Sequence, residues 1–364
     1  MGYINSIKTA IFIFPFIALL FTIPFILHQY HKYGSINLFR VLIVYSFILY
    51  MITIYFLVIL PLPSKNEVVA RPDMIKLIPF GFINDFINET SFVITDPSTY
   101  FKAIKEPCFY TVVFNIFMTI PFGMYLRYYF KCNLKKTIII SLILSLFFEI
   151  TQVTGLYFIY SHPYRVFDVD DLIMNTLGGI IGYCLMGFID NFLPTRDKID
   201  EESLKAGEKV SGLRRITVFC LDLFLYLVIA LNVYIAISKK YSLISIFIIY
   251  YLFIPILLKG QTIAEKFLNV KTLYDKHKII KDFLRIIWLY FYYLIFPFEV
   301  MNISNRLVVK LDMQTHESIL FYIIVIFVIF VYLIVNIIHL MTKHKTYYDN
   351  LFKIKYISTI NKGE

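Results

Sequence analysis

Nine long apolar runs dominate this sequence of 364 residues. A helix needs about 20 apolar residues to cross a bilayer. The hydrophobic share of 59% and the mean hydropathy of +0.71 exclude a soluble domain with an ordinary polar surface. We therefore expect an all-α fold, a polytopic membrane helical bundle of about nine transmembrane helices. The runs are 9–27, 38–60, 109–130, 137–157, 172–193, 215–237, 242–258, 283–300 and 318–341.

The distribution of basic residues predicts the orientation of these helices. The first run ends in HQYHKYG rather than in a small-residue cleavage site, so we expect a retained helix and not a signal peptide. Assigning the loops to alternate sides places 24 of the 35 Lys and Arg residues on one side. Because cytoplasmic loops are enriched in these residues, we expect the N-terminus outside and the C-terminus in the cytoplasm. We attribute the net charge of +10 to basic residues that set the membrane orientation and attract lipid headgroups. No pattern of basic residues suggests binding to nucleic acid.

A polar stretch divides the chain into two expected modules. Residues 194–212 are rich in charge and predict a cytoplasmic linker. We expect a first membrane domain of five helices at 1–193 and a second of about four helices, with a basic cytoplasmic tail, at 213–364. The four cysteines are widely spaced without metal-ligand spacing, which favours small apolar roles facing lipid or core.

Between 149 and 182, polar residues interrupt the apolar sequence. Ionisable groups near the hydrocarbon are costly unless they are paired or face a cavity, so such a cluster indicates a functional site. At helical spacing, Glu149 and Gln152 share one face, and Asp168, Asp171 and Asn175 share another. Three glycines follow and allow close approach of a neighbouring helix. The expected polar cluster comprises Glu149, Gln152, Arg165, Asp168, Asp170, Asp171 and Asn175. The expected helix-packing surface comprises Gly178, Gly179 and Gly182.

The pattern E-x-x-Q followed by R-x-x-D-x-x-D-x-x-x-N-x-x-G-G-x-x-G resembles the VanZ-like membrane proteins. The resemblance extends upstream through 76–80 and 114–123 and covers about 1–193. It implies a multi-pass protein of the bacterial cytoplasmic membrane, associated with lowered susceptibility to teicoplanin-type glycopeptide antibiotics. A cell-wall precursor or a lipid-linked ligand, beside the lipid bilayer itself, is the partner that this implies.

The residues alone leave several chemistries open for this cluster. Arg165 neutralising Asp168, with Asp171 and Asn175 capping a helix, would be a purely structural role. The carboxylates could instead perform acid–base work, hold calcium or magnesium, or bind a cationic or polyhydroxylated ligand. No nucleophile motif is present, so the sequence makes no positive case for an enzyme and indicates no cofactor.

The external segment 61–108 and the third run carry further polar residues. The piece 74–89 is too short and too interrupted to span, and we expect it to lie at the interface beside the cluster. Solvation is the favoured interpretation of its acids Asp85 and Glu89. For Asn115 and Pro121 in the third run, a helix kink is favoured over a ligand site.

The second module resembles the RDD family at about 211–356. The resemblance rests on 213–222, on the loop 260–266 and on Asp349, with Ala264 and Glu265 departing from the family's usual glycine and basic residue. It implies an alternative function, a cation/proton antiporter or transporter. The expected inner-face cluster is Arg214, Arg215, Asp222, Gly260, Gln261, Thr262, Lys266 and Asp349.

Overall fold

A computed structural model describes residues 2–237, 242–274, 278–343 and 347–360. These residues are mostly helical with two small two-stranded sheets, which confirms the expected all-α membrane bundle. By internal contacts the chain divides into two compact units, one of Met1–Thr22 with Leu38–Ile199 and one of Ile23–Asn37 with Asp200–Glu364. The boundary therefore lies inside the polar stretch 194–212. The sequence-based division at 193 did not anticipate that part of the first apolar run packs in the second unit.

Eight helices in the described ranges are long and apolar enough to span a bilayer, one fewer than the nine apolar runs. The exception is the seventh run, which forms a shorter apolar helix at Ile244–Leu257. At 1.5 Å per residue this is about 21 Å, less than the roughly 30 Å of a hydrocarbon core. The helix contains a π-helical turn, η4 (Ile249–Phe253), just before Pro255, which has no backbone N–H to donate.

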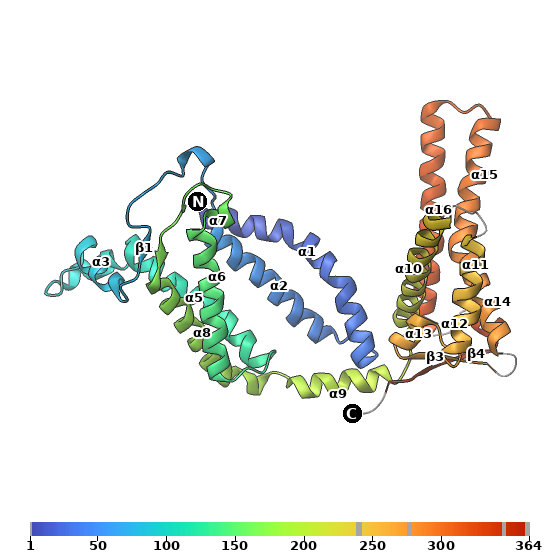
Figure 1. The fold of residues 1–364 in the computed structure, drawn as a ribbon, viewed down its shortest axis with the longest axis horizontal. Helices are drawn as coiled ribbons and strands as arrows, with labels where there is room; N and C mark the ends of the chain where they lie inside the picture. Colours follow the sequence, from blue (N-terminus) through green and yellow to red (C-terminus); the bar gives the residue numbers. More distant parts are fainter. Residues whose placement is uncertain (1, 238–241, 275–277, 344–346, 361–364) are drawn as a thin grey trace. The chain divides into compact units, whose positions relative to one another are not determined.

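The first unit is a bundle whose central pair is α5 and α8 (Figure 1). Between α2 and α5 the chain forms the short strand β1 and the short helix α3, and β1 pairs in parallel with β2. The core includes Ile54, Met118 and Phe148 from α2, α5 and α6. The elements are α1 (Gly2–Tyr33), α2 (Leu38–Ile59), η1 (Lys65–Glu67), β1 (Ile75–Lys76), α3 (Gly81–Glu89), η2 (Pro97–Thr99), α4 (Tyr100–Ala103), α5 (Pro107–Tyr128), α6 (Leu134–Val153), α7 (Gly155–Phe158), β2 (Phe167–Asp168), α8 (Val169–Ile189), η3 (Asp190–Phe192) and α9 (Arg196–Gly207).

Backbones approach closely between α5 and α8 because the contact is lined by glycine. A Cβ added at Gly178 would lie 2.2 Å from the Ile116 carbonyl oxygen, and one at Gly182 would lie 1.9 Å from that of Ile120. Gly179 faces Ser141 of α6, whose Oγ would lie 2.2 Å from an added Cβ. In lipid no hydrophobic effect drives helices together, so the close packing that small residues allow stabilises their association.

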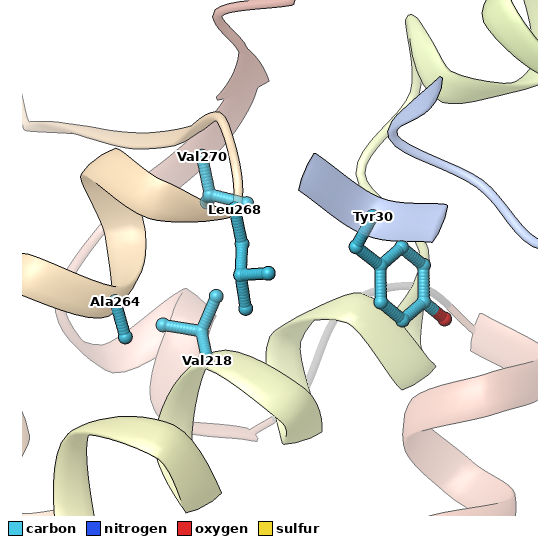
Figure 2. Close-up of a cluster of buried hydrophobic side chains, with 5 residues drawn as sticks. All are labelled: Tyr30, Val218, Ala264, Leu268 and Val270. Atoms are coloured by element: carbon cyan, nitrogen blue, oxygen red, sulfur yellow. The ribbon is translucent and has the colours of Figure 1, made fainter. Parts of the chain in front are cut away.

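The second unit combines membrane helices with a two-stranded antiparallel sheet, in which Thr272 pairs with Tyr356. Tyr30 contributes to a buried apolar cluster with residues of α10, α13 and β3 (Figure 2). The cluster is Tyr30, Val218, Ala264, Leu268 and Val270. The elements are α10 (Gly212–Ile237), α11 (Ser242–Ile248), η4, α12 (Ile254–Leu257), α13 (Ile263–Phe267), β3 (Val270–Tyr274), α14 (Lys278–Tyr290), η5 (Phe291–Ile295), α15 (Phe296–Lys310), α16 (Thr315–Lys343), α17 (Tyr347–Leu351) and β4 (Ile354–Ser358).

Candidate functional site

The start of α8 organises the polar cluster of the first unit. Asp168 is the N-cap of this helix, and its Oδ1 accepts a hydrogen bond of 2.8 Å from the Asp170 amide. The amide of Asp168 itself donates to Oε2 of Glu149 on α6, at 3.0 Å. Half-burial raises the pKa of the Asp168 carboxyl above its usual value. The Asp168 amide therefore holds the Glu149 carboxylate of α6 at the start of α8, while the Asp168 carboxylate is held by the Asp170 amide.

Asp170 holds the external segment against this helix. Its two carboxylate oxygens accept hydrogen bonds from the amides of Phe80, at 2.6 Å, and Phe82, at 2.9 Å, at the N-terminus of α3. A carboxylate at a helix N-terminus satisfies free amides and is favoured by the helix dipole. Asp170 is buried, so its role is to position α3 beside the cluster. The piece 74–89 therefore lies beside the cluster, as expected from the sequence.

The Asp171 carboxylate is held by Asn115, for which the sequence analysis favoured a helix kink over a ligand site. Asn115 of α5 donates from Nδ2 to Oδ1 of Asp171 at 2.5 Å. Ser145 of α6 donates to the Asp171 carbonyl oxygen at 3.2 Å, and Asn175 donates from Nδ2 to Ser145 at 2.9 Å. The signal for Asn115 was a lone amide inside an apolar span, which is costly there unless it has a partner.

Arg165 does not pair with Asp168, contrary to the structural alternative considered from the sequence. Its guanidinium donates to the carbonyl oxygens of Val58, at 2.8 Å, and Leu60, at 3.4 Å, where α2 ends. Gln152 donates to the same Val58 oxygen at 3.0 Å. Both side chains therefore satisfy carbonyls that the helix end leaves free.

These residues surround one cavity of about 620 Å³. Asp85 and Glu89 of α3 also line it. Glu89 is exposed, in agreement with the solvation expected for it, and Asp85 forms an ion pair of 3.3 Å with Lys76. Their segment lies beside the cluster, as expected from the sequence, because Asp170 accepts hydrogen bonds from the amides at the start of α3. The polar lining comprises Lys76, Asp85, Glu89, Asn115, Glu149, Gln152, Arg165, Asp168, Asp170, Asp171 and Asn175.

The carboxylates lie around the cavity rather than at one point. Within the described parts of the chain, no group of three or more His, Cys, Asp or Glu side chains could hold a metal ion. The calcium or magnesium alternative therefore gains no geometric support from the described residues.

In the second unit, the expected inner-face cluster is tied together by internal bonds. Asp222 accepts from the Tyr250 hydroxyl at 2.8 Å, from the Thr262 hydroxyl at 2.5 Å and from the Ala264 amide at 3.1 Å. Arg215 forms a buried ion pair of 2.8 Å with Asp349. Both acids of the expected cluster, Asp222 and Asp349, are thus engaged in contacts between elements of the second unit.

Arg214 is fully buried and binds backbone carbonyls rather than an acid. It donates to the oxygens of Gly34, Gly207, Leu268 and Asn269 at 2.7 to 3.1 Å. Within the ranges that the structure describes, three other expected members of the cluster make fewer contacts or none that involve a charged partner. Gln261 bonds the Val270 carbonyl at 2.7 Å, Gly260 adopts a positive φ of 84°, and Lys266 is exposed.

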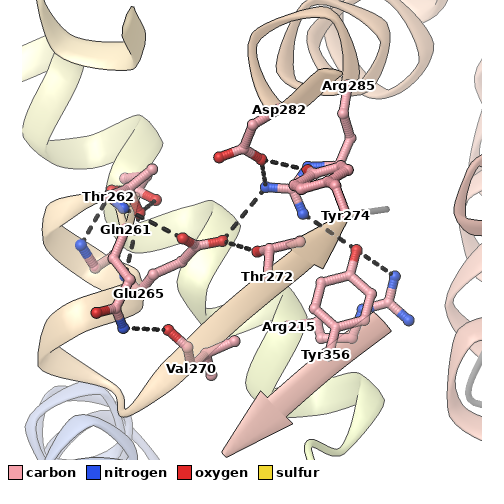
Figure 3. A network of polar contacts seen from close by, with 12 residues as sticks. Arg215, Gln261, Thr262, Glu265, Val270, Thr272, Tyr274, Asp282, Arg285 and Tyr356 are labelled. Carbon is pink, nitrogen blue, oxygen red and sulfur yellow. Dashed lines mark hydrogen bonds and ion pairs between the residues drawn. The ribbon is translucent and has the colours of Figure 1, made fainter. Parts of the chain in front are cut away.

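A second network in this unit was not expected (Figure 3). Glu265, which departs from the RDD pattern, is buried and lies 3.4 Å from Arg285, while Asp282 lies 2.9 Å from the same guanidinium. Thr272 donates to Glu265 at 2.5 Å. Burial and the neighbouring Asp282 raise the pKa of Glu265 above its usual range. An acid at this loop position therefore has a partner on α14, which no local motif reveals.

The fold and the acidic cavity define a polytopic membrane protein with a polar site between its helices. Residues 47–190 match the family model of VanZ/LLP1, so this part of the chain is VanZ-like. The match contains the whole cluster from Glu149 to Asn175 and ends before α9 and α10 begin. No curated protein and no solved structure matches the chain. The RDD resemblance of the second module stays a prediction.

Proposed function

We propose that this chain acts on the cell envelope from the extracytoplasmic face of a bacterial cytoplasmic membrane and lowers susceptibility to teicoplanin-type antibiotics. The observation that carries the proposal is the acidic cavity, which lies wholly within the VanZ-like part of the chain. The glycopeptide link is what the VanZ-like resemblance implies.

The orientation is part of the proposal and rests on the basic residues. Around the first five runs, where the alternation of sides does not depend on the short seventh helix, 12 of the 19 Lys and Arg residues up to Arg215 lie on the side opposite the loop that contains Arg165. This excess supports an extracytoplasmic position for that loop and for the cavity. A site there would meet cell-wall precursors and lipid-linked ligands without transport across the membrane.

Binding is favoured over turnover as the mode of action. Of the side chains that line the cavity, the only nucleophilic thiol or hydroxyl groups are Cys108 and Thr111, and no histidine is there to activate them. The carboxylates hold backbone amides and the Asn115 amide, which fixes them in place. A fixed array of acceptors suits recognition of a ligand.

Expression of the full chain in a susceptible Gram-positive host tests the proposal. The chain should raise the inhibitory concentration of teicoplanin, and the double variant Glu149→Gln/Asp171→Asn should return it to that of the host alone at equal membrane abundance. Asp96→Asn is the matched control, because this exposed carboxylate of the external segment caps η2 and does not line the cavity. No change in susceptibility with the abundant wild-type chain would contradict the proposal, as would full activity of the double variant.

A further inference from the structure

The cavity contains hydrogen-bond acceptors that lack donors. Asn175 is 4% exposed and lines the cavity, and its Oδ1 has no hydrogen-bond partner. The orientation of its amide follows from the network: the Ser145 hydroxyl donates to the Asp171 carbonyl and can only accept from Asn175 Nδ2. Oδ1 is therefore the atom left over, and a buried acceptor without a donor is unfavourable.

Two carboxylates beside it also have a free oxygen. Glu149 uses Oε2 for the Asp168 amide, and Asp171 uses Oδ1 for Asn115. In the described chain neither Oε1 of Glu149 nor Oδ2 of Asp171 receives a hydrogen bond. Glu149, Asp171 and Asn175 come from α6 and α8 and all line one cavity. What is missing there is a group with several N–H donors.

The charge of the lining points to a cation. Six carboxylates and only two cationic side chains, Lys76 and Arg165, line the cavity. Lys76 is occupied by Asp85, and Arg165 by the carbonyls of α2. A positively charged donor would therefore be attracted and hydrogen-bonded at once, which is the stronger kind of hydrogen bond.

The remaining walls are apolar. Phe82, Phe114 and Phe148 line the cavity from α3, α5 and α6, together with Met118 and Leu57. Concave sites with a few polar groups in an apolar lining bind ligands that combine both characters. A small hydrated ion would leave this surface unused.

We infer that the cavity binds a primary ammonium group joined to an apolar segment. The inference rests on the proposed function in that it names the ligand class of the same site. Two sources carry this chemistry, an amine-bearing lipid headgroup and a soluble amphiphilic amine, and the experiment separates them.

The test uses the purified full chain in phosphatidylcholine nanodiscs, whose choline headgroup has no N–H donor. Decylammonium, decyltrimethylammonium and decanol are titrated while the unfolding temperature is followed, since a ligand that binds the folded state raises it. Short-chain phosphatidylethanolamine against short-chain phosphatidylcholine supplies the lipid arm. Empty nanodiscs correct for partitioning of each probe.

We expect decylammonium to bind at least about tenfold more tightly than decyltrimethylammonium, because the trimethyl group keeps the charge but loses the donors. Stabilisation by phosphatidylethanolamine would identify a lipid source, and stabilisation by decylammonium alone a soluble one. Glu149→Gln/Asp171→Asn should weaken binding, and Asp96→Asn should not. Lys76→Gln should tighten it, a gain that misfolding cannot imitate.

Equal stabilisation by all three decyl probes, or affinity that is unchanged in the double variant, would overturn the inference. If the ammonium fails to bind while the chain still lowers susceptibility, the ligand class is wrong and the proposed function stands. If it binds with the expected variant pattern but susceptibility never changes, the ligand class stands and the proposed function is wrong.

Discussion

A single methyl group added at Gly182 should separate α5 from α8. The new Cβ would lie 1.9 Å from the Ile120 carbonyl oxygen, whereas ordinary contact begins at 3.4 Å. The obstacle is backbone of another helix, so the helices must move apart locally by about 1.5 Å. Overpacking of this kind costs about 1–3 kcal/mol, and close glycine contacts cannot be recovered by a rotamer change.

Gly187→Ala provides the control on the same helix. Its Cβ would lie 2.6 Å from Nη1 of Arg127, the far end of a flexible side chain that can move aside. Thermal unfolding in detergent, scanned at one rate because such unfolding is often irreversible, compares the two variants. We expect Gly182→Ala to unfold about 4 °C or more below the wild type and Gly187→Ala to stay close to it. Equal unfolding temperatures for both variants would refute the reasoning that backbone contact decides the effect.

Three further predictions concern other parts of the chain. In a cysteine-free background, a cysteine at the exposed Ser161 should react with an impermeant thiol reagent in intact cells, and reaction only after the membrane is opened would reverse the orientation. Arg165→Gln should lower the free energy of unfolding by about 1 kcal/mol, because the Leu60 carbonyl loses its donor and the Val58 carbonyl keeps only Gln152; an unchanged denaturation midpoint would contradict this. Glu265 holds its proton more tightly when folded, with a pKa of about 7, so its contribution to stability is present below its unfolded pKa and is lost as the pH rises through the folded value. The unfolding temperature of the wild type relative to Glu265→Gln should therefore fall from about pH 5 to about pH 8, and a flat difference would refute the raised pKa.

The sequence predicted the helices because they depend on local spacing, and the first site was proposed from the same kind of spacing. Long apolar runs identify spans, and the i, i+3 rule brought Glu149 with Gln152 and Asp168 with Asp171 onto common faces. The packing role proposed for the glycines follows from the same periodicity.

The hydrogen-bond partners of those residues could not be predicted because they are distant in the sequence. Asn115 and Asp171 are separated by 56 positions, and nothing in either neighbourhood encodes the contact. Asp170 could be recognised as acidic at a helix start, but the amides that it caps belong to α3, 88 and 90 positions away. Arg285 was hidden for another reason: it lies in a predicted span, where a lone arginine gives no hint of two acidic partners.

The acids of the two units differ in how they are hydrogen-bonded, and this difference supports assigning the proposed function to the first unit. Asp222 has three donors, so a structural role accounts for it, whereas Glu149 and Asp171 each keep an oxygen without a donor in the described chain. Both oxygens belong to side chains that line the cavity, so they are available to a ligand there. Asp222→Asn should accordingly lower the unfolding temperature and leave teicoplanin susceptibility unchanged once membrane abundance is matched. Sodium-dependent proton movement in inverted vesicles that disappears in a stable Asp222→Asn chain would contradict this assignment and favour the transporter alternative.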